Sequence, residues 1–377
     1  MQPQSVLPTI LFAGISLLTL PSRGGASGFL TQSSKGVTSG QFLKLGAGAR
    51  ATALGEAYSA VADDASALYW NPGGLTRIPG GSLALMHATY IESTFYDYAA
   101  YGQNLGTWGA FGLGAQFLSA GSITQTDTSG NDQGTFNPND MALSLGYAHT
   151  LFGGSVGVAG KLIRSTILNT AQTEALDIGV LSPGFFEERI KLSLTATNLG
   201  GQLKYEQEAE DLPQAYRVGS QVRISDPWFF SLDGVAPNDN QPYIALGTEY
   251  TLKSSQDLSL SFRGGLNTRD TQDLSGFSSF SFGVGVNFHD FSLDYAFLPL
   301  GTLGNTNQFS LSYKWGNAEE KPRPRKDKRF ETGRSAPSME ELFRAKFQEI
   351  PDLQTKTPEP APTMSSAALT GPAGDVK

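Results

Sequence analysis

The chain has 377 residues, a net charge of -8, 44 glycines, 11% aromatic residues and no cysteine. The lack of cysteine excludes thiol catalysis, thiolate metal sites and disulfides, and the negative charge argues against nucleic acid, which is bound by clustered Lys and Arg. A mean hydropathy of -0.20, with no apolar run near twenty residues beyond the N-terminus, excludes a helical membrane protein. A barrel remains compatible, because its strands alternate lipid-facing and lumen-facing side chains.

Residues 1–26 are predicted to be a secretory signal peptide. The apolar stretch 10–20, ILFAGISLLTL, is too short to span a bilayer, and Gly24 and Ala26 provide small residues for cleavage. The first nine residues carry no Lys or Arg, so the n-region is atypical. A buried N-terminal segment is the alternative interpretation.

The block 40–78 is the only glycine- and alanine-rich, helix-compatible stretch ahead of a long series of alternating runs. We interpret residues 27–80 as an N-terminal plug. Within it, Gly46, Gly48 and Ala51 satisfy the relaxed dinucleotide fingerprint. The context does not fit, since no buried strand precedes the motif and no βαβ alternation follows. Close packing of the plug backbone against a wall explains these small residues better, and no cofactor is predicted.

From 81 to 316 the sequence predicts an all-β domain, a fourteen-stranded antiparallel outer-membrane β-barrel. Apolar residues recur at every second position in fourteen runs bounded by turn residues. The expected strands are 82–90, 95–104, 107–118, 139–149, 155–168, 172–182, 190–199, 215–224, 228–236, 242–252, 257–267, 277–288, 290–297 and 307–315. An even number of strands fits closure of a bacterial barrel.

Alternation alone is also typical of a soluble β-sandwich. Three features favour the membrane barrel: the export signal, a last run that ends on the aromatics Tyr313 and Trp315, and glycines at the expected inward positions Gly283 and Gly285. Such glycines leave space for a plug. The long polar loop 119–138 and the acidic loop 200–214 are expected on the outside.

Residues 317–377 are predicted to be a disordered, Pro-rich tail on the periplasmic side. The segment 339–350 within it has helical spacing of apolar residues after a capping-box pair, Ser338 and Glu341. This stripe has no core of its own, so we interpret it as a partner-binding helix. Its apolar residues are Met339, Leu342, Phe343, Phe347 and Ile350.

No catalytic or metal site is predicted. His87, His149 and His289 are the only histidines, and no spacing pairs them with a nucleophile or with each other. The loop residues Asp127, Asn131 and Asp132 could offer oxygen ligands to calcium, but they lack the regular carboxylate positions of a calcium hand. A solvated turn is favoured there, and the chain is predicted not to be an enzyme.

Several short motifs in the sequence resemble motifs of a known family. VADDASALYWNPGGL (61–75) resembles the plug motif of the long-chain fatty acid transporter (FadL) superfamily, and 40–64 is similar to the PorV/PorQ family. The closing segment 293–315, LDYAFLPLGTLGNTNQFSLSYKW, is similar to the last hairpin of that family. Leu212-Pro213 and Arg217-Val218-Gly219 match another of its recurring sequence motifs. One departure is Gly73, where the family usually has Ala after Asn-Pro.

This resemblance implies a barrel with an N-terminal hatch in the outer membrane of a diderm bacterium. In the family it further implies a role in type IX secretion, with a translocon or secreted cargo as protein partner. The alternative is a FadL-like passive transporter of hydrophobic small molecules. Outer-membrane lipid is the expected surrounding, and nucleic acid is excluded as a partner.

Candidate site residues follow from the same motif. Asp63, Asp64, Asn71, Pro72 and Gly73 form the plug motif, with a structural or a ligand-gating role. Pro fixes φ and Asn can bond the wall, so a plug-stabilising turn is favoured over direct ligand contact. For the transporter alternative, the candidate lumen contacts in an apolar pocket are Phe42, Leu43 and Leu45.

Overall fold

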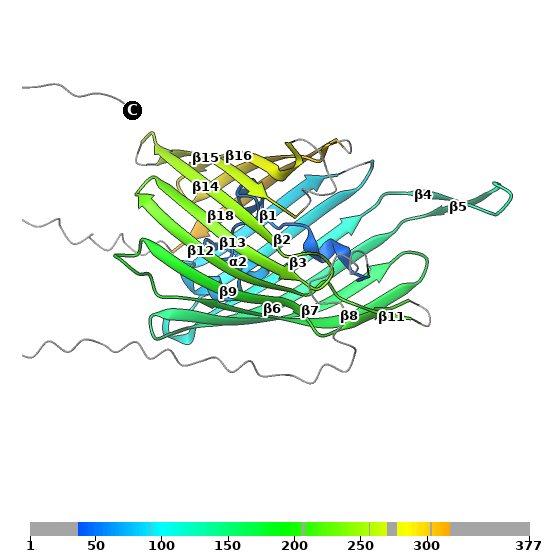
Figure 1. Ribbon diagram of the computed structural model, residues 1–377, viewed down its shortest axis with the longest axis horizontal. Coiled ribbons are helices and arrows are strands. Elements are labelled where there is room, and N and C mark those ends of the chain that lie inside the picture. The colour runs from blue at the N-terminus through cyan, green and yellow to red at the C-terminus, as the bar shows by residue number, and fades with distance from the viewer. Residues whose placement is uncertain are drawn as a thin grey trace, which may run out of the picture. The chain divides into compact units, whose positions relative to one another are not determined.

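The computed structural model describes residues 37–316, apart from 91, 206–207, 256, 270–276 and 302–303. Within this part of the chain, fourteen strands form a closed antiparallel barrel (Figure 1). Each strand pairs with the barrel strands that precede and follow it, and the first strand closes onto the last. The prediction of a fourteen-stranded antiparallel barrel is therefore confirmed, and a two-sheet sandwich is excluded.

The barrel strands are β1 (Gly81–Thr89), β2 (Phe95–Asn104), β3 (Ala110–Ser119), β6 (Asn139–Leu151), β7 (Gly154–Thr166), β8 (Thr170–Leu181), β9 (Ile190–Leu199), β12 (Ala215–Ser225), β13 (Trp228–Pro237), β14 (Tyr243–Lys253), β15 (Leu258–Asn267), β16 (Phe280–Phe288), β17 (Phe291–Pro299) and β18 (Asn305–Trp315). Two short 3₁₀ turns, η4 (Gly106–Trp108) and η5 (Phe277–Ser279), precede β3 and β16.

The outward face of the barrel is apolar and the inward face is largely polar. In β16, Phe282, Val284 and Val286 are exposed, whereas the intervening Ser281 and Gly283 are buried. Closure leaves no strand edge with unpaired backbone groups, which is what a lipid environment requires. No helix of the described residues is long and apolar enough to cross a membrane.

Both ends of the barrel sequence lie at one rim. Gly81 at the start of β1 is in register with Trp315 at the end of β18, and we name this edge the terminal rim and the opposite edge the distal rim. Trp315 stacks on Tyr313, with ring centroids 5.4 Å apart, and contacts Tyr101 at 5.9 Å. The aromatic end of the last strand therefore contributes to the seam that closes the barrel.

The described residues before β1, 37–80, fill the barrel interior. They contain four short helices: η2 (Gln41–Lys44), α1 (Ala49–Ala53), α2 (Ala67–Trp70) and η3 (Pro72–Arg77). Small residues allow close approach to the wall: a side chain at Gly283 would collide with the Ala53 methyl group. Gly55 has a φ of 65° and lies directly against the backbone of β14 and β15, so only glycine fits there without strain.

The two loops expected to be irregular contain strands of their own. Residues 119–138 include the hairpin of β4 (Ile123–Thr126) and β5 (Asp132–Phe136), which extends beyond the barrel in Figure 1. Residues 200–214 include β10 (Gln202–Lys204) paired with β11 (Ala209–Asp211). Their polar, turn-rich composition concealed the pairing, because an exposed two-stranded ribbon has no apolar face to produce alternation.

The Asp127 turn explains one of these hairpins. Asp127 Oδ1 accepts hydrogen bonds from the backbone N–H groups of Ser129 and Asn131, at 2.8 and 2.9 Å. Its Oδ2 accepts from the Asn131 side chain at 2.9 Å. The carboxylate is thus used to build the turn. The predicted signal peptide 1–26, the tail 317–377 and its helix 339–350 lie outside the described residues.

Candidate functional site

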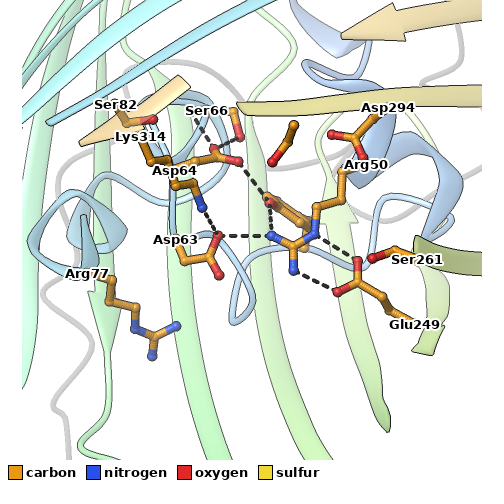
Figure 2. A network of polar contacts seen from close by, with 12 residues as sticks. Arg50, Asp63, Asp64, Ser66, Arg77, Ser82, Glu249, Ser261, Asp294 and Lys314 are labelled. Carbon is orange, nitrogen blue, oxygen red and sulfur yellow. Dashed lines mark hydrogen bonds and ion pairs between the residues drawn. The ribbon is translucent and has the colours of Figure 1, made fainter. Parts of the chain in front are cut away.

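The plug motif and the wall meet in a network of ion pairs, shown in Figure 2. Asp63 Oδ1 accepts hydrogen bonds from Arg50 Nη1 at 2.9 Å and from Lys314 Nζ of β18 at 3.1 Å. Asp64 instead caps its own segment, accepting from the Ser66 N–H at 2.8 Å and the Ser66 hydroxyl at 2.5 Å. Of the two predicted acids, Asp63 therefore joins plug to wall and Asp64 shapes the plug.

Arg50 is the centre of this network. Its guanidinium donates from Nε and Nη2 to the two Glu249 oxygens, at 2.8 and 3.0 Å, a bidentate pair between α1 and β14. Glu249 also accepts from Arg263 Nε at 2.6 Å, and Arg263 Nη1 donates to Asp294 at 2.7 Å. Alternating charges thus run from the plug across β14, β15 and β17, so each buried charge has an opposite partner.

The surroundings keep the plug members of the network charged. Burial favours the neutral form of Asp63, but Lys314 and Arg50 outweigh it and lower the pKa of this carboxyl well below its usual range. Burial likewise disfavours the Arg50 charge, yet Glu249, Tyr58 and Asp63 raise the pKa of the guanidinium well above its ordinary value. The contact is consequently ionic at any pH near neutrality.

A second contact holds the plug through a turn without charges. Asn71 Nδ2 donates to the Ser59 carbonyl at 2.9 Å and to the Val180 carbonyl of β8 at 3.3 Å, while Oδ1 accepts from the Gly73 N–H at 3.1 Å. The Gly73 carbonyl accepts from the Ser155 hydroxyl of β7 at 2.8 Å. Pro72 begins η3 at the position where a missing N–H costs nothing.

A cavity of about 60 Å³ opens beside the plug toward the distal rim. Trp70, Tyr69 and Leu43 of the plug form one part of its lining, and Pro213, Pro237 and Tyr243 contribute from the wall and distal loops. The charged lining residues are Lys44, Lys161, Arg217, Arg269, Glu56 and Asp239. Both apolar and cationic surfaces therefore face this distal cavity, whereas the sequence predicted an apolar pocket.

Each cation of the distal cavity is held by an acid. Lys161 Nζ lies 2.7 Å from Asp177 Oδ2 and donates to Asn198 at 2.8 Å, and Arg217 lies 3.2 Å from Asp233. Lys44 pairs with Asp239 at 2.8 Å. Burial opposes ionisation of Asp239, but hydrogen bonds from Lys44, Thr38 and Gln41 lower the pKa of this carboxyl. A fixed set of positive groups is thus presented to the cavity.

The three candidate lumen contacts occupy different places. Leu43 lines the distal cavity, and its carbonyl accepts a hydrogen bond from the Tyr69 hydroxyl at 3.0 Å. Phe42 is buried in a cluster with Ile163 and Leu203 of the wall and distal loop, and Leu45 packs at the edge of that cluster. Phe42 and Leu45 do not line this cavity.

The lumenal charges of the strands were missed by the sequence reasoning. Lys161, Asp177, Arg217 and Asp233 all sit at inward positions, each next to at least one exposed apolar residue: Leu162, Leu176, Val218 and Leu232, respectively. The signal was present, because in an amphipathic strand a charge that alternates with lipid-facing residues must face the lumen. The sequence did not indicate which of these charges form pairs across the barrel.

Lys161 borders a second hollow, on the outside of the wall. This outer groove, with a volume of about 1130 Å³, lies over β6 to β9 and is lined by Leu145, Leu162, Leu176 and Gly160, among others. Lys161 belongs to the linings of both this groove and the distal cavity. The register of β8 and β9 shifts here, between Leu176 and Ile178.

A column of stacked side chains separates the distal cavity from the terminal side. Arg217 lies over the Trp70 ring at 5.3 Å, Trp70 meets Tyr58 edge-on at 6.0 Å, and Arg50 lies over Tyr58 at 5.6 Å. Beyond Arg50 is a polar cavity of about 140 Å³ lined by Glu249, Arg263 and Lys314. The plug thus divides the lumen between two cavities of different character.

The histidines form no recognisable catalytic arrangement. His87 Nδ1 lies 2.7 Å from Asp97 on the outward face, so one histidine does reach a carboxylate. The nearby hydroxyl of Ser310 is buried on the lumen side and accepts from the Ala49 N–H at 2.7 Å. His149 Nδ1 lies 3.4 Å from the Tyr147 hydroxyl oxygen. Among the described residues no group of His, Asp and Glu is arranged to hold a metal ion.

Comparisons with known proteins were made on sequence and on structure. A family model described as "Uncharacterised protein family (UPF0164)" matches residues 22–173. No curated protein matches the sequence. Similar solved structures include the Pseudomonas putida toluene transporter TodX, at 11% identity and a TM-score of 0.45, covering 69% of this chain and 95% of that chain.

Two further structures have similar scores. The Ralstonia pickettii toluene transporter TbuX is 13% identical, with a TM-score of 0.47, and the match covers 72% of this chain and 98% of that chain. A Pseudomonas aeruginosa FadL homologue is 10% identical, with a TM-score of 0.44, covering 70% and 96%. The fold assignment above rests on the strand pairing of this chain itself.

Proposed function

We propose that this chain is an outer-membrane channel of a diderm bacterium that exchanges a small amphiphilic molecule between the distal cavity and the surrounding membrane. The observation that carries the proposal is the position of Lys161, which borders both the cavity and the outer groove. The register of β8 and β9 shifts at Asp177, the ion-pair partner of Lys161. An apolar groove on the outside and a mixed cavity inside suit a molecule with an apolar body and a polar end.

The chemistry of the cavity supports an anionic or polar end group. Lys161, Arg217 and Arg269 surround the space, while Trp70 and Tyr69 offer flat apolar surfaces. Buried cations held by acids keep their positions, so a ligand meets a preorganised set of donors rather than mobile side chains. Trp70, which directly precedes Asn71 and Pro72, lines the cavity from the plug side.

The test is uptake of 11-(dansylamino)undecanoic acid into vesicles that contain the full-length protein. Gly160→Leu should slow uptake severalfold, because an added side chain at this outward glycine meets no protein atom within 4 Å and would fill the groove. Gly234→Leu is the matched control: it adds the same bulk to another strand glycine with no neighbour closer than 4.0 Å. Equal rates in wild type, both variants and empty vesicles would contradict the proposal.

The secretion-associated role remains a prediction from sequence likeness. Its proposed docking element, the helix 339–350, lies outside the described residues, and the matching family model is an uncharacterised one. No geometry of the described residues favours a translocon or secreted cargo as partner. Recovery of a secretion complex with the tagged protein would be the observation that revives it.

A further inference from the structure

A pair of polar, ionisable side chains lies on the outward face of the barrel, within a row of aromatic residues. Across four strands, Phe309, His87, Asp97 and Phe117 are in register with one another. His87 and Asp97 are 55% and 44% exposed and are joined by one contact of 2.7 Å between Nδ1 and Oδ1. Ionisable side chains on the outward surface of such a barrel are costly in hydrocarbon, so this position calls for an explanation.

The position of the pair along its strands, close to the distal rim, explains part of this arrangement. His87 is two residues from the distal end of β1, and Asp97 is two residues from the distal start of β2. Aromatic rings surround them: Phe95 lies 6.1 Å from His87 and 6.0 Å from Phe117. An aromatic belt near one rim is typical of the headgroup level of a membrane. The pair therefore lies where lipid headgroups end and acyl chains begin.

An apolar hollow of about 500 Å³ adjoins the pair on its membrane side. The next row of the sheet contains Leu311, Leu85, Ala99 and Ala115 in register. The outward strand neighbours of Ala99 are Asp97 and Tyr101, and those of Ala115 are Leu113 and Phe117, so the surface is lower at the two alanines than at the larger side chains around them. The polar pair and the apolar depression form one continuous lining.

The pair retains unused hydrogen-bonding groups. One ring nitrogen and one carboxylate oxygen make the mutual contact, and no hydrogen bond from a described residue reaches His87 Nε2 or Asp97 Oδ2. When the ring is protonated on both nitrogens, its Nε2–H can donate while Nδ1–H is held by Asp97 Oδ1, and Asp97 Oδ2 can accept. Together they complement a headgroup that carries both an anionic oxygen and an ammonium donor.

We propose that this hollow is a binding site for one zwitterionic phospholipid. An acyl chain lies over Ala99 and Ala115, the phosphate accepts a hydrogen bond from His87, and the ammonium group donates to Asp97. Such a lipid satisfies the polar pair and fills the depression at the same time. This site uses other residues than the distal cavity and does not depend on the transport proposal.

The experiment is native mass spectrometry of the full-length protein in detergent, titrated with phosphatidylethanolamine. Wild type should retain one bound lipid that a His87→Ala/Asp97→Ala variant loses, with occupancy falling about tenfold at equal lipid, as expected for loss of charge-assisted hydrogen bonds. Ala99→Leu should have a similar effect by filling the hollow while the pair stays intact. Diacylglycerol with the same chains should bind much more weakly.

A matched control exists at the terminal rim. His289 and Asp257 form another exposed pair, at 3.6 Å, in the turns that flank β15 and β16. His289→Ala/Asp257→Ala should leave the retained lipid unchanged. Heat-modifiable migration on gels reports folding of every variant, and Ala115→Leu replaces Ala99→Leu if that variant does not fold. Equal retention in wild type and the His87/Asp97 variant, or equal binding of diacylglycerol, would overturn the proposal.

Discussion

Two of the places where the plug is joined to the wall are chemically different. At one, Arg50 and Asp63 form ion pairs with Glu249 and Lys314 of β14 and β18. At the other, the Asn71 side chain and the Gly73 carbonyl bond β7 and β8 without any charge. Charged contacts respond to pH and neutral ones do not, so the two attachments should be separable by experiment.

The largest effect is expected from Arg50→Ala. It removes a bidentate pair with Glu249 and a contact with Asp63, and leaving buried acids short of a partner should weaken plug docking by about 3 kcal/mol. Hydrogen exchange of the plug amides measures this directly. Arg50→Lys keeps the positive charge but cannot form the bidentate pair with Glu249, so its exchange rates should lie between those of Arg50→Ala and wild type. Unchanged exchange in Arg50→Ala would show that the ionic attachment contributes nothing.

Asn71→Ala should come next. This substitution removes the hydrogen-bond partner of the Ser59 and Val180 carbonyls and of the Gly73 N–H. Leaving these buried polar groups unpaired should lower the stability of plug docking by about 2 kcal/mol. Exchange should rise first in 71–77, and the Arg50 region should follow less. If both regions change equally, the two attachments act as one cooperative unit.

Acid should loosen only the ionic attachment. The pKa of Asp63 is lowered in the folded protein, so its stabilising contribution is complete above the ordinary carboxyl pKa of about 4 and is lost as pH falls further. The plug should therefore exchange normally near neutrality and open at the Arg50 side below that pH. Asp63→Asn should reduce the acid dependence, with Glu249 as the remaining acid bonded to Arg50, while the Asn71 turn keeps its protection in both proteins.

Gly73→Ala should have the smallest effect. An added Cβ would lie 3.2 Å from Asn71 Oδ1 and from the Gly179 carbonyl, which is tight but close to what small shifts relieve. We expect a loss of about 1 kcal/mol or less, visible as slightly faster exchange of 71–77. A loss as large as that of Asn71→Ala would mean that the family's usual alanine cannot fit this wall.

Much of the fold could be predicted from the sequence. Alternation such as Phe280, Phe282 and Val284 predicted the outward-facing positions. Inward Gly283 was correctly expected to make room for the plug, where it faces Ala53, whereas Gly285 makes room for the wall residues Arg263 and Asp294 instead. The sequence did not reveal the hairpins β4–β5 and β10–β11, whose exposed faces produce no apolar pattern. It also gave no sign that His87 and Asp97, ten residues apart, would be neighbours across β1 and β2.

The sequence by itself determined the period of the strands, their number and the composition of the plug, because these depend on local alternation and on turn residues. Only the tertiary structure decided which inward charges meet. Glu249 and Arg50 are 199 residues apart in the chain and become partners when the barrel closes around the plug. Their pairing depends on register and on the path of the plug, and neither is encoded in the neighbourhood of any one residue.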